Sequence, residues 1–393
     1  MVVVVVVAVV AVLLVSVGIA GGPGAPPVAA VQVVLPPAHV LPAADPKMPW
    51  PATGEAAVVI PAVGYAAQSG PEQPVPVASM TKVMTANVVL HDHPLATGVN
   101  GPNLTVSPAE AQDFTTDLNT TQASVEIQAG EVLSERQALD GMLVHSANDL
   151  AYTLAIWDAG SIPAFVAKMN ATAVKLGMHQ THYADASGYT PHSVSTAADL
   201  LKVTSAAMAY PAFAQGVAMP SVTLPVSGTA LSYTPLLAGG TESTPGVVGV
   251  KSGFTSAAGG GDILAYQTSV GGQPVTVLAA VTSQQGPSVL VASGRMALAV
   301  AQHAASSIVS VPAIAQGQVV AKATVPGTAV PVVATRPATL LAMPGQRIRQ
   351  TVVVVHHPRV GSRAGAMVGT ALFTLGEQQV AVRVRTTQRL GQR

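Results

Sequence analysis

The chain has 393 residues, of which 49% are hydrophobic and only 9% charged, and its formal net charge is zero. Disorder requires low hydrophobicity and high net charge, so this composition excludes a disordered protein and allows one large domain plus a small one. The absence of cysteine excludes disulfides, thiolate nucleophiles and cysteine-based zinc sites.

The first element along the chain is an apolar run over residues 1–20, which contains no charged residue. The first basic residue is Lys47, so the positive start of an ordinary export signal is missing. The run is still long enough to cross a membrane. We expect an export signal or a membrane anchor here, and cleavage near Val28-Ala29-Ala30 stays open. Residues 21–54 are rich in Pro, Ala and Gly, which predicts an extended linker.

Residues 55–312 are expected to form the main domain. It begins with two predicted strands, Ala56–Ile60 and Val63–Ala67, flanked by turn-forming residues. A helix is expected from Ser79 to about Leu90, ending before Pro94. Apolar spacing and turn residues predict the remaining elements: helices at Ser134–Val144, Ser146–Trp157, Ile162–Leu176, Thr196–Ala209 and Ser288–Ser306, and strands at Val247–Lys251, Asp262–Gln267 and Val275–Thr282.

Residues 313–393 are expected to form a small basic β domain, because short apolar runs such as Gln350–Val355 and Met367–Thr374 are separated by Gly and Pro. Residues 336–393 carry nine arginines against Glu377 alone, whereas residues 1–335 carry an excess of acids. This asymmetry predicts contact with an anionic wall or membrane surface, with the acidic body of the chain, or simply a solvated face. The segment lacks interleaved aromatic residues, which argues against nucleic-acid binding.

Three short motifs occur in order along the main domain. Ser79 and Lys82 are three residues apart, so on a helix a potential nucleophile faces a potential base. Of the seven lysines, only Lys82 has a serine three residues before it. Ser146-Ala147-Asn148 and Lys251-Ser252-Gly253 follow. The ordered triple is typical of active-site serine enzymes that interact with penicillin.

The residues around these motifs (PVASMTKVMTA, AGEVLSERQALDGMLVHSANDLA, DASGYTPHSVSTAADL and VGVKSGFTSAAGGG) resemble the D-alanyl-D-alanine carboxypeptidases of peptidase family S11, the low-molecular-weight penicillin-binding proteins. The resemblance covers roughly residues 50–310. It implies an α+β, DD-peptidase/β-lactamase-like fold, in which helices flank an antiparallel sheet and a helical subdomain carries the second motif. It implies no metal and no cofactor.

The resemblance also implies catalytic roles for Ser79, Lys82 and Ser146. Ser79 would be the nucleophile. Lys82 would be its base, which requires a lowered pKa from burial or from a second cation. Ser146 would relay a proton to the leaving amine.

The other implied roles concern the substrate. The backbone N–H groups of Ser79 and Phe254 would bind the oxyanion. Asn148 would bind the amide on the acyl side, and Lys251 and Ser252 would hold the terminal carboxylate. Gly253 would let the substrate backbone approach closely.

Two positions depart from the usual motifs. The third motif is K-S-G in place of K-T-G, which keeps the hydroxyl, and the second is S-A-N in place of S-G-N, which adds the methyl of Ala147. Neither change removes a polar group. Two motif residues have a structural alternative as well: Ser79 could be a helix N-cap, and Lys251 a solvated residue at a strand end. His91-Asp92-His93 resembles a metal pair but falls where the helix should end, so a capping or solvated cluster is favoured.

The resulting interpretation is an exported serine D-Ala-D-Ala carboxypeptidase that trims the stem peptides of peptidoglycan and is inhibited by β-lactams. One alternative is a β-lactamase, which needs an acidic residue to hold the deacylating water, and the segment 177–193 offers only Asp185. The other alternative is a non-catalytic wall-binding protein that has kept the cleft.

Overall fold

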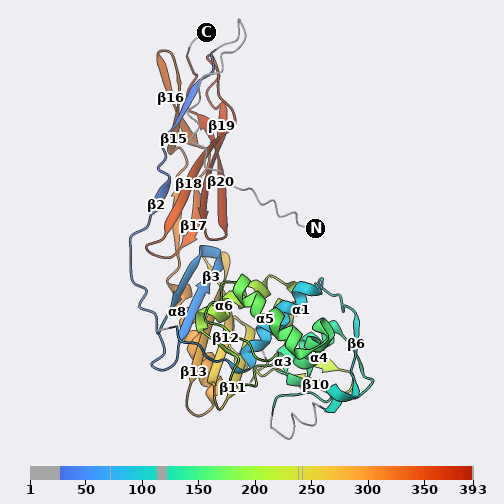
Figure 1. Cartoon of the computed structure of the whole chain (residues 1–393). Coiled ribbons are helices and arrows are strands. Elements are labelled where there is room, and N and C mark those ends of the chain that lie inside the picture. The colour runs from blue at the N-terminus through green and yellow to red at the C-terminus, as the bar shows by residue number, and fades with distance from the viewer. Residues whose placement is uncertain (1–26, 71, 113–121, 238, 241, 392–393) are drawn as a thin grey trace. The chain divides into compact units, whose positions relative to one another are not determined.

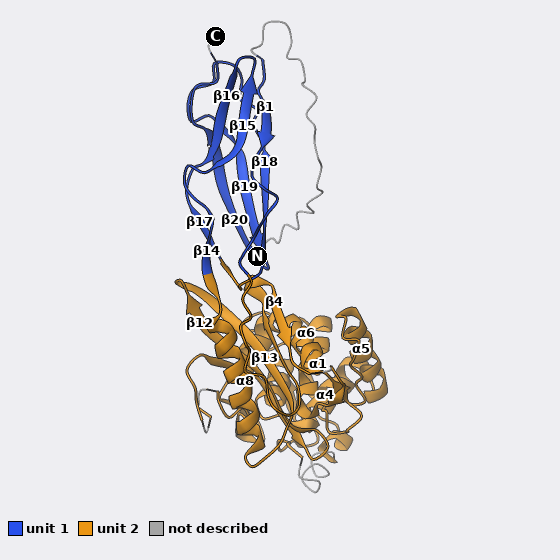
Figure 2. Cartoon of the chain, turned by 90° about the vertical axis from the view of Figure 1, so that its left-hand side faces the viewer, with its two compact units in different colours: residues 1–42, 310–340, 345–393 blue, residues 43–309, 341–344 orange. Residues whose placement is uncertain are grey.

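The computed structural model describes residues 27–70, 72–112, 122–237, 239–240 and 242–391. Two compact units are present (Figure 2). Unit 1 comprises residues 1–42, 310–340 and 345–393, and unit 2 comprises residues 43–309 and 341–344. The apolar run over residues 1–20, expected to be an export signal or anchor, lies outside the described residues.

Unit 2 is built on a five-stranded antiparallel sheet in the order β11-β12-β13-β3-β4 (Figure 1). The strands are β3 (Ala56–Ile60), β4 (Tyr65–Gln68), β11 (Val247–Thr255), β12 (Gly259–Val270) and β13 (Gln273–Gln284). Between β12 and β13 the two-residue turn Gly271-Gly272 has φ values of 57° and 79°. Positive φ at both positions suits a tight hairpin, and glycine accepts it without strain. β11, which carries the third motif, is an edge strand of this sheet.

The two faces of the sheet are covered by different helices. Successive residues of one strand point to opposite faces, so they pack against different helices. Leu278 and Ala280 join the core that contains most helices, whereas Val277 and Ala279 pack against α8 (Val289–Ser306). The other helices are α1 (Lys82–Asp92), α3 (Glu135–Val144), α4 (Asn148–Ala159), α5 (Ile162–Lys175), α6 (Ala197–Met208) and α7 (Pro211–Val217). The α+β class is therefore confirmed.

Local sequence explains where the helices begin and end. Ser134 caps α3 through a reciprocal pair of bonds with Gln137, the arrangement called a capping box. Gly160 ends α4 in the left-handed conformation, as glycine commonly does. The helix predicted from Ser79 begins as a single 3-10 turn, η2 (Ala78–Thr81), and continues as α1.

Unit 1 is a seven-stranded sheet in the order β1-β15-β16-β20-β19-β18-β2. Its C-terminal strands are β15 (Val319–Val325), β16 (Thr328–Ala334), β18 (Arg347–Val354), β19 (Met367–Leu375) and β20 (Gln378–Thr386). A separate two-stranded sheet pairs β14 (Val309–Ile314) with β17 (Ala338–Ala342).

The N-terminal linker expected over residues 21–54 is not purely a linker. β1 (Ala30–Val33) pairs with β15, and β2 (Ala38–Val40) pairs with β18, so both belong to the seven-stranded sheet. Both are edge strands, where neighbouring prolines are tolerated because one side of the strand makes no ladder bonds. Their partners lie roughly 300 residues away in the sequence, so no local pattern predicts the pairing.

Candidate active site

Ser79 and Lys82 meet at the start of α1. Lys82 Nζ donates a hydrogen bond to Ser79 Oγ at 3.0 Å, as the spacing of three residues predicts. Ser79 is half-buried in η2, whereas the Lys82 side chain is completely buried. The hydroxyl is thus within reach of both the base and a ligand.

Lys82 Nζ has two further acceptors, Asn148 Oδ1 at 2.6 Å and the carbonyl oxygen of Ser187 at 2.8 Å. An ammonium group has three N–H donors, and these three acceptors would satisfy all of them. A neutral amine has two N–H donors and a lone pair. With its two donors on Asn148 and Ser187, the lone pair would face the hydroxyl of Ser79.

The second motif forms the turn between α3 and α4. Ser146 is buried and has a φ of 62°, in the left-handed region that non-glycine residues seldom adopt. Such strain often marks a functional position. Asn148 begins α4 and is buried, and its Nδ2 donates to Gln122 Oε1 at 2.5 Å. The motif thereby supplies a side chain that contacts Lys82 directly.

The third motif lies on β11, directly beside Ser79. A Cβ added to Gly253 would lie 2.9 Å from the backbone nitrogen of Ser79, so only glycine permits this approach. Lys251 Nζ donates to the carbonyl oxygen of Ser252 at 2.9 Å, and Ser252 Oγ donates to that of Tyr233 at 3.0 Å. The side chains of Lys251 and Ser252 therefore bond to backbone carbonyls of the protein. Of the three motif residues, Gly253 is the one whose backbone lies against Ser79.

Asp262 is a buried carboxylate that belongs to none of the three motifs. It lies opposite Ser252 on β12, and neither of its oxygens has a hydrogen-bond partner among the described residues. Burial raises the pKa of Asp262, and Lys251 opposes the rise. Burial lowers the pKa of Lys251, and Asp262 opposes the fall. Burial therefore favours the neutral form of each group.

The loop that follows α5 delivers the carbonyl of Ser187 to Lys82. Asp185 organises this loop by accepting bonds from Ser187 Oγ at 2.8 Å, Tyr189 N at 2.9 Å and Ser193 Oγ at 2.5 Å. Gly188 has a φ of 81°, and an added Cβ would lie 1.8 Å from the carbonyl oxygen of Ala78. The stretch DASGYT resembles the family, but its spacing alone did not reveal a contact with the base.

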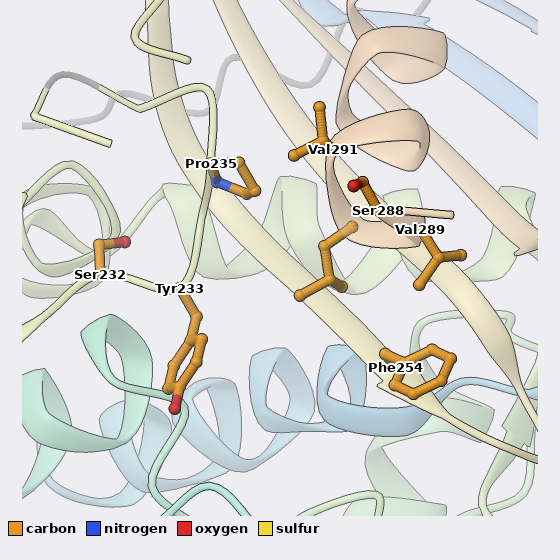
Figure 3. A pocket seen from close by; sticks show the side chains of 8 residues that line it. Ser232, Tyr233, Pro235, Phe254, Ser288, Val289 and Val291 are labelled. Carbon is orange, nitrogen blue, oxygen red and sulfur yellow. The ribbon is translucent and has the colours of Figure 1, made fainter. Parts of the chain in front are cut away.

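A cleft of about 430 Å³ opens at Ser79. Its walls come from five segments: Ser79, Gln122 with Ala123, Asn148, Gly188 with Tyr189 and Pro191, and Phe254–Ala257. Phe254 is half-exposed and also borders a second pocket of about 540 Å³, with Tyr233, Pro235 and the start of α8 (Figure 3). Of these two pockets only the first contains Ser79, the candidate nucleophile, so it is the candidate active site.

The histidine cluster at the end of α1 makes structural contacts. His93 Nε2 lies 3.1 Å from Asp158 Oδ1, and its ring packs on Trp157 with centroids 4.1 Å apart. Asp92 pairs with Lys168 at 2.8 Å. Within the described ranges, no group of three or more His, Asp or Glu side chains could hold a metal ion.

Comparison with known proteins places this site in a family. The model of the D-alanyl-D-alanine carboxypeptidases, peptidase family S11, matches residues 63–281, more than half of the chain. A D-alanyl-D-alanine carboxypeptidase of Mycobacterium tuberculosis is 38% identical over 189 residues, which cover 47% of this chain and 59% of that protein. A D-alanyl-D-alanine endopeptidase of Pseudomonas aeruginosa is 33% identical over 216 residues, or 53% of this chain and 64% of that protein. Both matches thus span less than two thirds of the relative's length.

Solved structures share the fold. The crystal structure of a D-alanyl-D-alanine carboxypeptidase from Francisella tularensis has a TM-score of 0.59 at 16% identity, covering 89% of this chain and 96% of that one. The Streptomyces K15 DD-transpeptidase has a TM-score of 0.57 at 24% identity, covering 66% of this chain and 99% of that one. At these identities the likeness concerns the fold alone.

Proposed function

Since the chain belongs to the D-alanyl-D-alanine carboxypeptidase family, peptidase family S11, we propose that it removes the terminal D-alanine from peptidoglycan stem peptides through a Ser79 acyl-enzyme. The observation that carries this proposal is the 3.0 Å bond between Lys82 Nζ and Ser79 Oγ at the floor of a cleft. β-Lactams would acylate the same serine.

Acylation begins when neutral Lys82 takes the proton of Ser79 Oγ, which attacks the carbonyl carbon of the penultimate D-alanine. The backbone N–H groups of Ser79 and Phe254 stabilise the resulting oxyanion. The close approach of Gly253 to Ser79 N supports this role, because it brings β11 next to the nucleophile. The C–N bond then breaks, and the leaving amine receives its proton through Ser146. Water hydrolyses the ester and regenerates the Ser79 hydroxyl.

The substrate is held on both sides of the scissile bond. Asn148 contacts the amide of the acyl portion, while Lys251 and Ser252 hold the terminal carboxylate. Ser252 must then turn its hydroxyl away from the Tyr233 carbonyl, to which it donates in the free protein. No residue in this scheme requires a cofactor.

A β-lactamase is the closest alternative activity, and the geometry of Asp185 argues against it. Fast hydrolysis of the acyl-enzyme often relies on an acidic residue that holds a water. Among the described residues that line the cleft, none is acidic. Asp185 already accepts three hydrogen bonds within its own loop, so it is committed to structure.

Labelling with benzylpenicillin tests the proposed nucleophile. Intact-mass spectrometry should show one adduct on the full chain and none on Ser79→Ala. Wild-type protein should also release D-alanine from a peptide that ends in Lys-D-Ala-D-Ala. An adduct that persists in Ser79→Ala would assign the nucleophile elsewhere. An adduct without D-alanine release would favour a penicillin-binding protein that has lost turnover.

The proposed substrate implies an extracytoplasmic location, with the apolar residues 1–20 as export signal or anchor. Among the described residues, no single helix has the length and apolarity of a membrane span, and only α4 and α5 together, bent by 86°, reach it.

Unit 1 is proposed to contact an anionic wall or membrane surface. It holds ten of the 18 Lys and Arg residues of the chain but only one of the 18 Asp and Glu residues. Arg347 and Arg349 are exposed on β18, and Arg383 and Arg385 are exposed on β20. The strand register through β19 places all four on one face of the sheet. Replacing these four arginines by glutamine should abolish low-salt retention on isolated cell walls while penicillin acylation stays unchanged. Retention that survives would refute the contact surface.

A further inference from the structure

The segment that begins at Gln122 runs along the start of α4 and is tied to it at two backbone positions. Asn148 N donates to the carbonyl oxygen of Ala123 at 2.8 Å. Val125 N donates to Asp149 Oδ2 at 3.1 Å, and this carboxylate is buried. The backbone therefore holds Gln122 beside the second motif independently of its side chain.

The side chain of Gln122 completes a row of hydrogen bonds that reaches the nucleophile. Gln122 Oε1 accepts from Asn148 Nδ2 at 2.5 Å, and Asn148 Oδ1 accepts from Lys82 Nζ at 2.6 Å. Lys82 Nζ in turn contacts Ser79 Oγ at 3.0 Å. Both ends of the Asn148 carboxamide are thus engaged, one by a catalytic candidate and the other by a residue that no motif includes.

The orientation of this carboxamide decides whether Lys82 can act as a base. With Oδ1 toward Lys82, the oxygen accepts an N–H and leaves the amine lone pair for Ser79. If the carboxamide turned over, Nδ2 would face Nζ. It would repel an ammonium, because both groups are donors, and it would donate to the lone pair of a neutral amine. In either state proton transfer from Ser79 would be hindered.

We propose that Gln122 is a positioning residue that keeps the Asn148 carboxamide in its productive orientation and so keeps the lone pair of Lys82 directed at Ser79. The inference rests on the proposed acylation of Ser79. An acceptor is needed at this position, because only an acceptor favours Nδ2 on the Gln122 side. Gln122 lines the cleft and is half-buried, so its side chain can be replaced without opening the core.

The test is the pH profile of acylation by benzylpenicillin in three variants of the full chain. In Gln122→Leu the plateau rate should fall by roughly tenfold or more, the effect of about 1.4 kcal/mol in the barrier. On the acidic side of the profile, the rise of the acylation rate should move to lower pH. The reason is that the ammonium form of Lys82 loses the Asn148 acceptor and becomes less favourable. In Gln122→Glu the plateau should survive, because a carboxylate can only accept, and this rise should move to higher pH, because a nearby anion favours the ammonium.

Gln128→Leu is the matched control, because Gln128 is an exposed glutamine of the same segment. It should leave the profile unchanged. A purely structural role for Gln122 predicts that Leu and Glu reduce the rate equally and leave the pH of the rise unchanged, and this result would overturn the proposal.

A second measurement separates this proposal from the proposed function. The side-chain 15N–1H signals of Asn148, assigned with Asn148→Asp, report its contacts without any substrate. They should be slow to exchange in wild type and in Gln122→Glu, and fast in Gln122→Leu. Signals that are unaffected by Gln122→Leu would overturn the positioning role. Failure of the wild type to form a penicillin adduct would instead overturn the function of Ser79, while the Asn148 signals would still decide the contact with Gln122.

Discussion

At the scale of single residues, the site depends on a buried lysine that contacts polar groups from separate parts of the chain. Ser79 belongs to the same turn, but Asn148 and Ser187 are 66 and 105 residues away from Lys82. The surroundings of Lys82, the proposed base, are therefore assembled by the fold and leave little room for a different cation.

Lys82→Arg should abolish acylation by benzylpenicillin, because a guanidinium stays protonated and cannot accept the proton of Ser79. We expect the acylation rate to fall by roughly two to four orders of magnitude, the usual contribution of a general base. Stopped-flow acylation measures the rate, and circular dichroism checks the fold. Lys175→Arg, at an exposed position at the end of α5, should react like wild type. A reactive Lys82→Arg enzyme would require another base.

Glu135 should make the protein less stable as pH rises. Burial raises its pKa from 4.5 to about 7, so folding favours the protonated acid. At low pH both the folded and the unfolded states are protonated, and the penalty is absent. Between about pH 4.5 and pH 7 the unfolded state ionises first, and the folded state loses stability.

Glu135→Gln removes this penalty. At pH 8 the variant should be more stable than wild type by up to about 3 kcal/mol, since one pKa unit corresponds to about 1.4 kcal/mol. At pH 4.5 the advantage should largely disappear. Urea unfolding at both pH values measures the difference. The exposed Glu126→Gln is the control and should show no such dependence. A Glu135→Gln advantage that is independent of pH would point to packing rather than ionisation.

At the scale of elements, the site forms where five segments converge: η2, the segment that begins at Gln122, the α3–α4 turn, the loop after α5 and the edge strand β11. Glycine allows two of these approaches, at Gly188 and Gly253, where an added Cβ would meet η2. The loop that contains Gly188 is held by the hydrogen bonds of Asp185 and by the completely buried side chain of Tyr183, so it has little freedom to move away from η2. A small steric change at Gly188 should therefore disturb the contact with η2.

Gly188→Ala should displace the loop from η2, because the new Cβ would overlap the Ala78 carbonyl oxygen. The carbonyl of Ser187 would then leave Lys82, and acylation should fall by roughly 100-fold, as expected for a displacement of about 1 Å. Gly160→Ala is the control: Gly160 has a similar positive φ of 75° but nothing within 4 Å of the added Cβ. It should cost similar backbone strain and keep normal acylation. Equal acylation by both variants would show that the contact with η2 is dispensable.

At the scale of the whole molecule, unit 1 combines strands from the N-terminal and the C-terminal parts of the sequence in one sheet. β1 and β2 cover the two ends of a sheet otherwise built from residues 319–386. Conversely, residues 341–344 belong to unit 2, where Leu341 and Met343 join the core on the α8 side. A cut near residue 312 would therefore remove part of the unit 2 core, and a start at residue 50 would remove two strands of unit 1.

A fragment of residues 43–393 should lose stability in unit 1 only. Without β1 and β2, the strands β15 and β18 become exposed edges, which invite aggregation. Calorimetry should show one transition lowered by several degrees, with increased light scattering, while acylation at Ser79 is unchanged. A fragment of residues 27–393 keeps both strands and should match the full chain. If both fragments melted alike, the terminal strands would contribute nothing to unit 1.

The sequence by itself determined the fold class, most helices and strands of unit 2, and the meeting of Ser79 with Lys82. The helices and strands follow from local periodicity and the Ser79–Lys82 contact from spacing within one helical turn, whereas the fold class follows from the resemblance of the motif residues to a known family. Tertiary structure alone decided the places of β1 and β2, the contacts of Gln122 and Ser187 with the site, and the burial of Asp262 near Lys251. Each of these depends on a contact between residues that are distant in the sequence. Such contacts produce no regular spacing of residue types along the chain, so the sequence does not predict them.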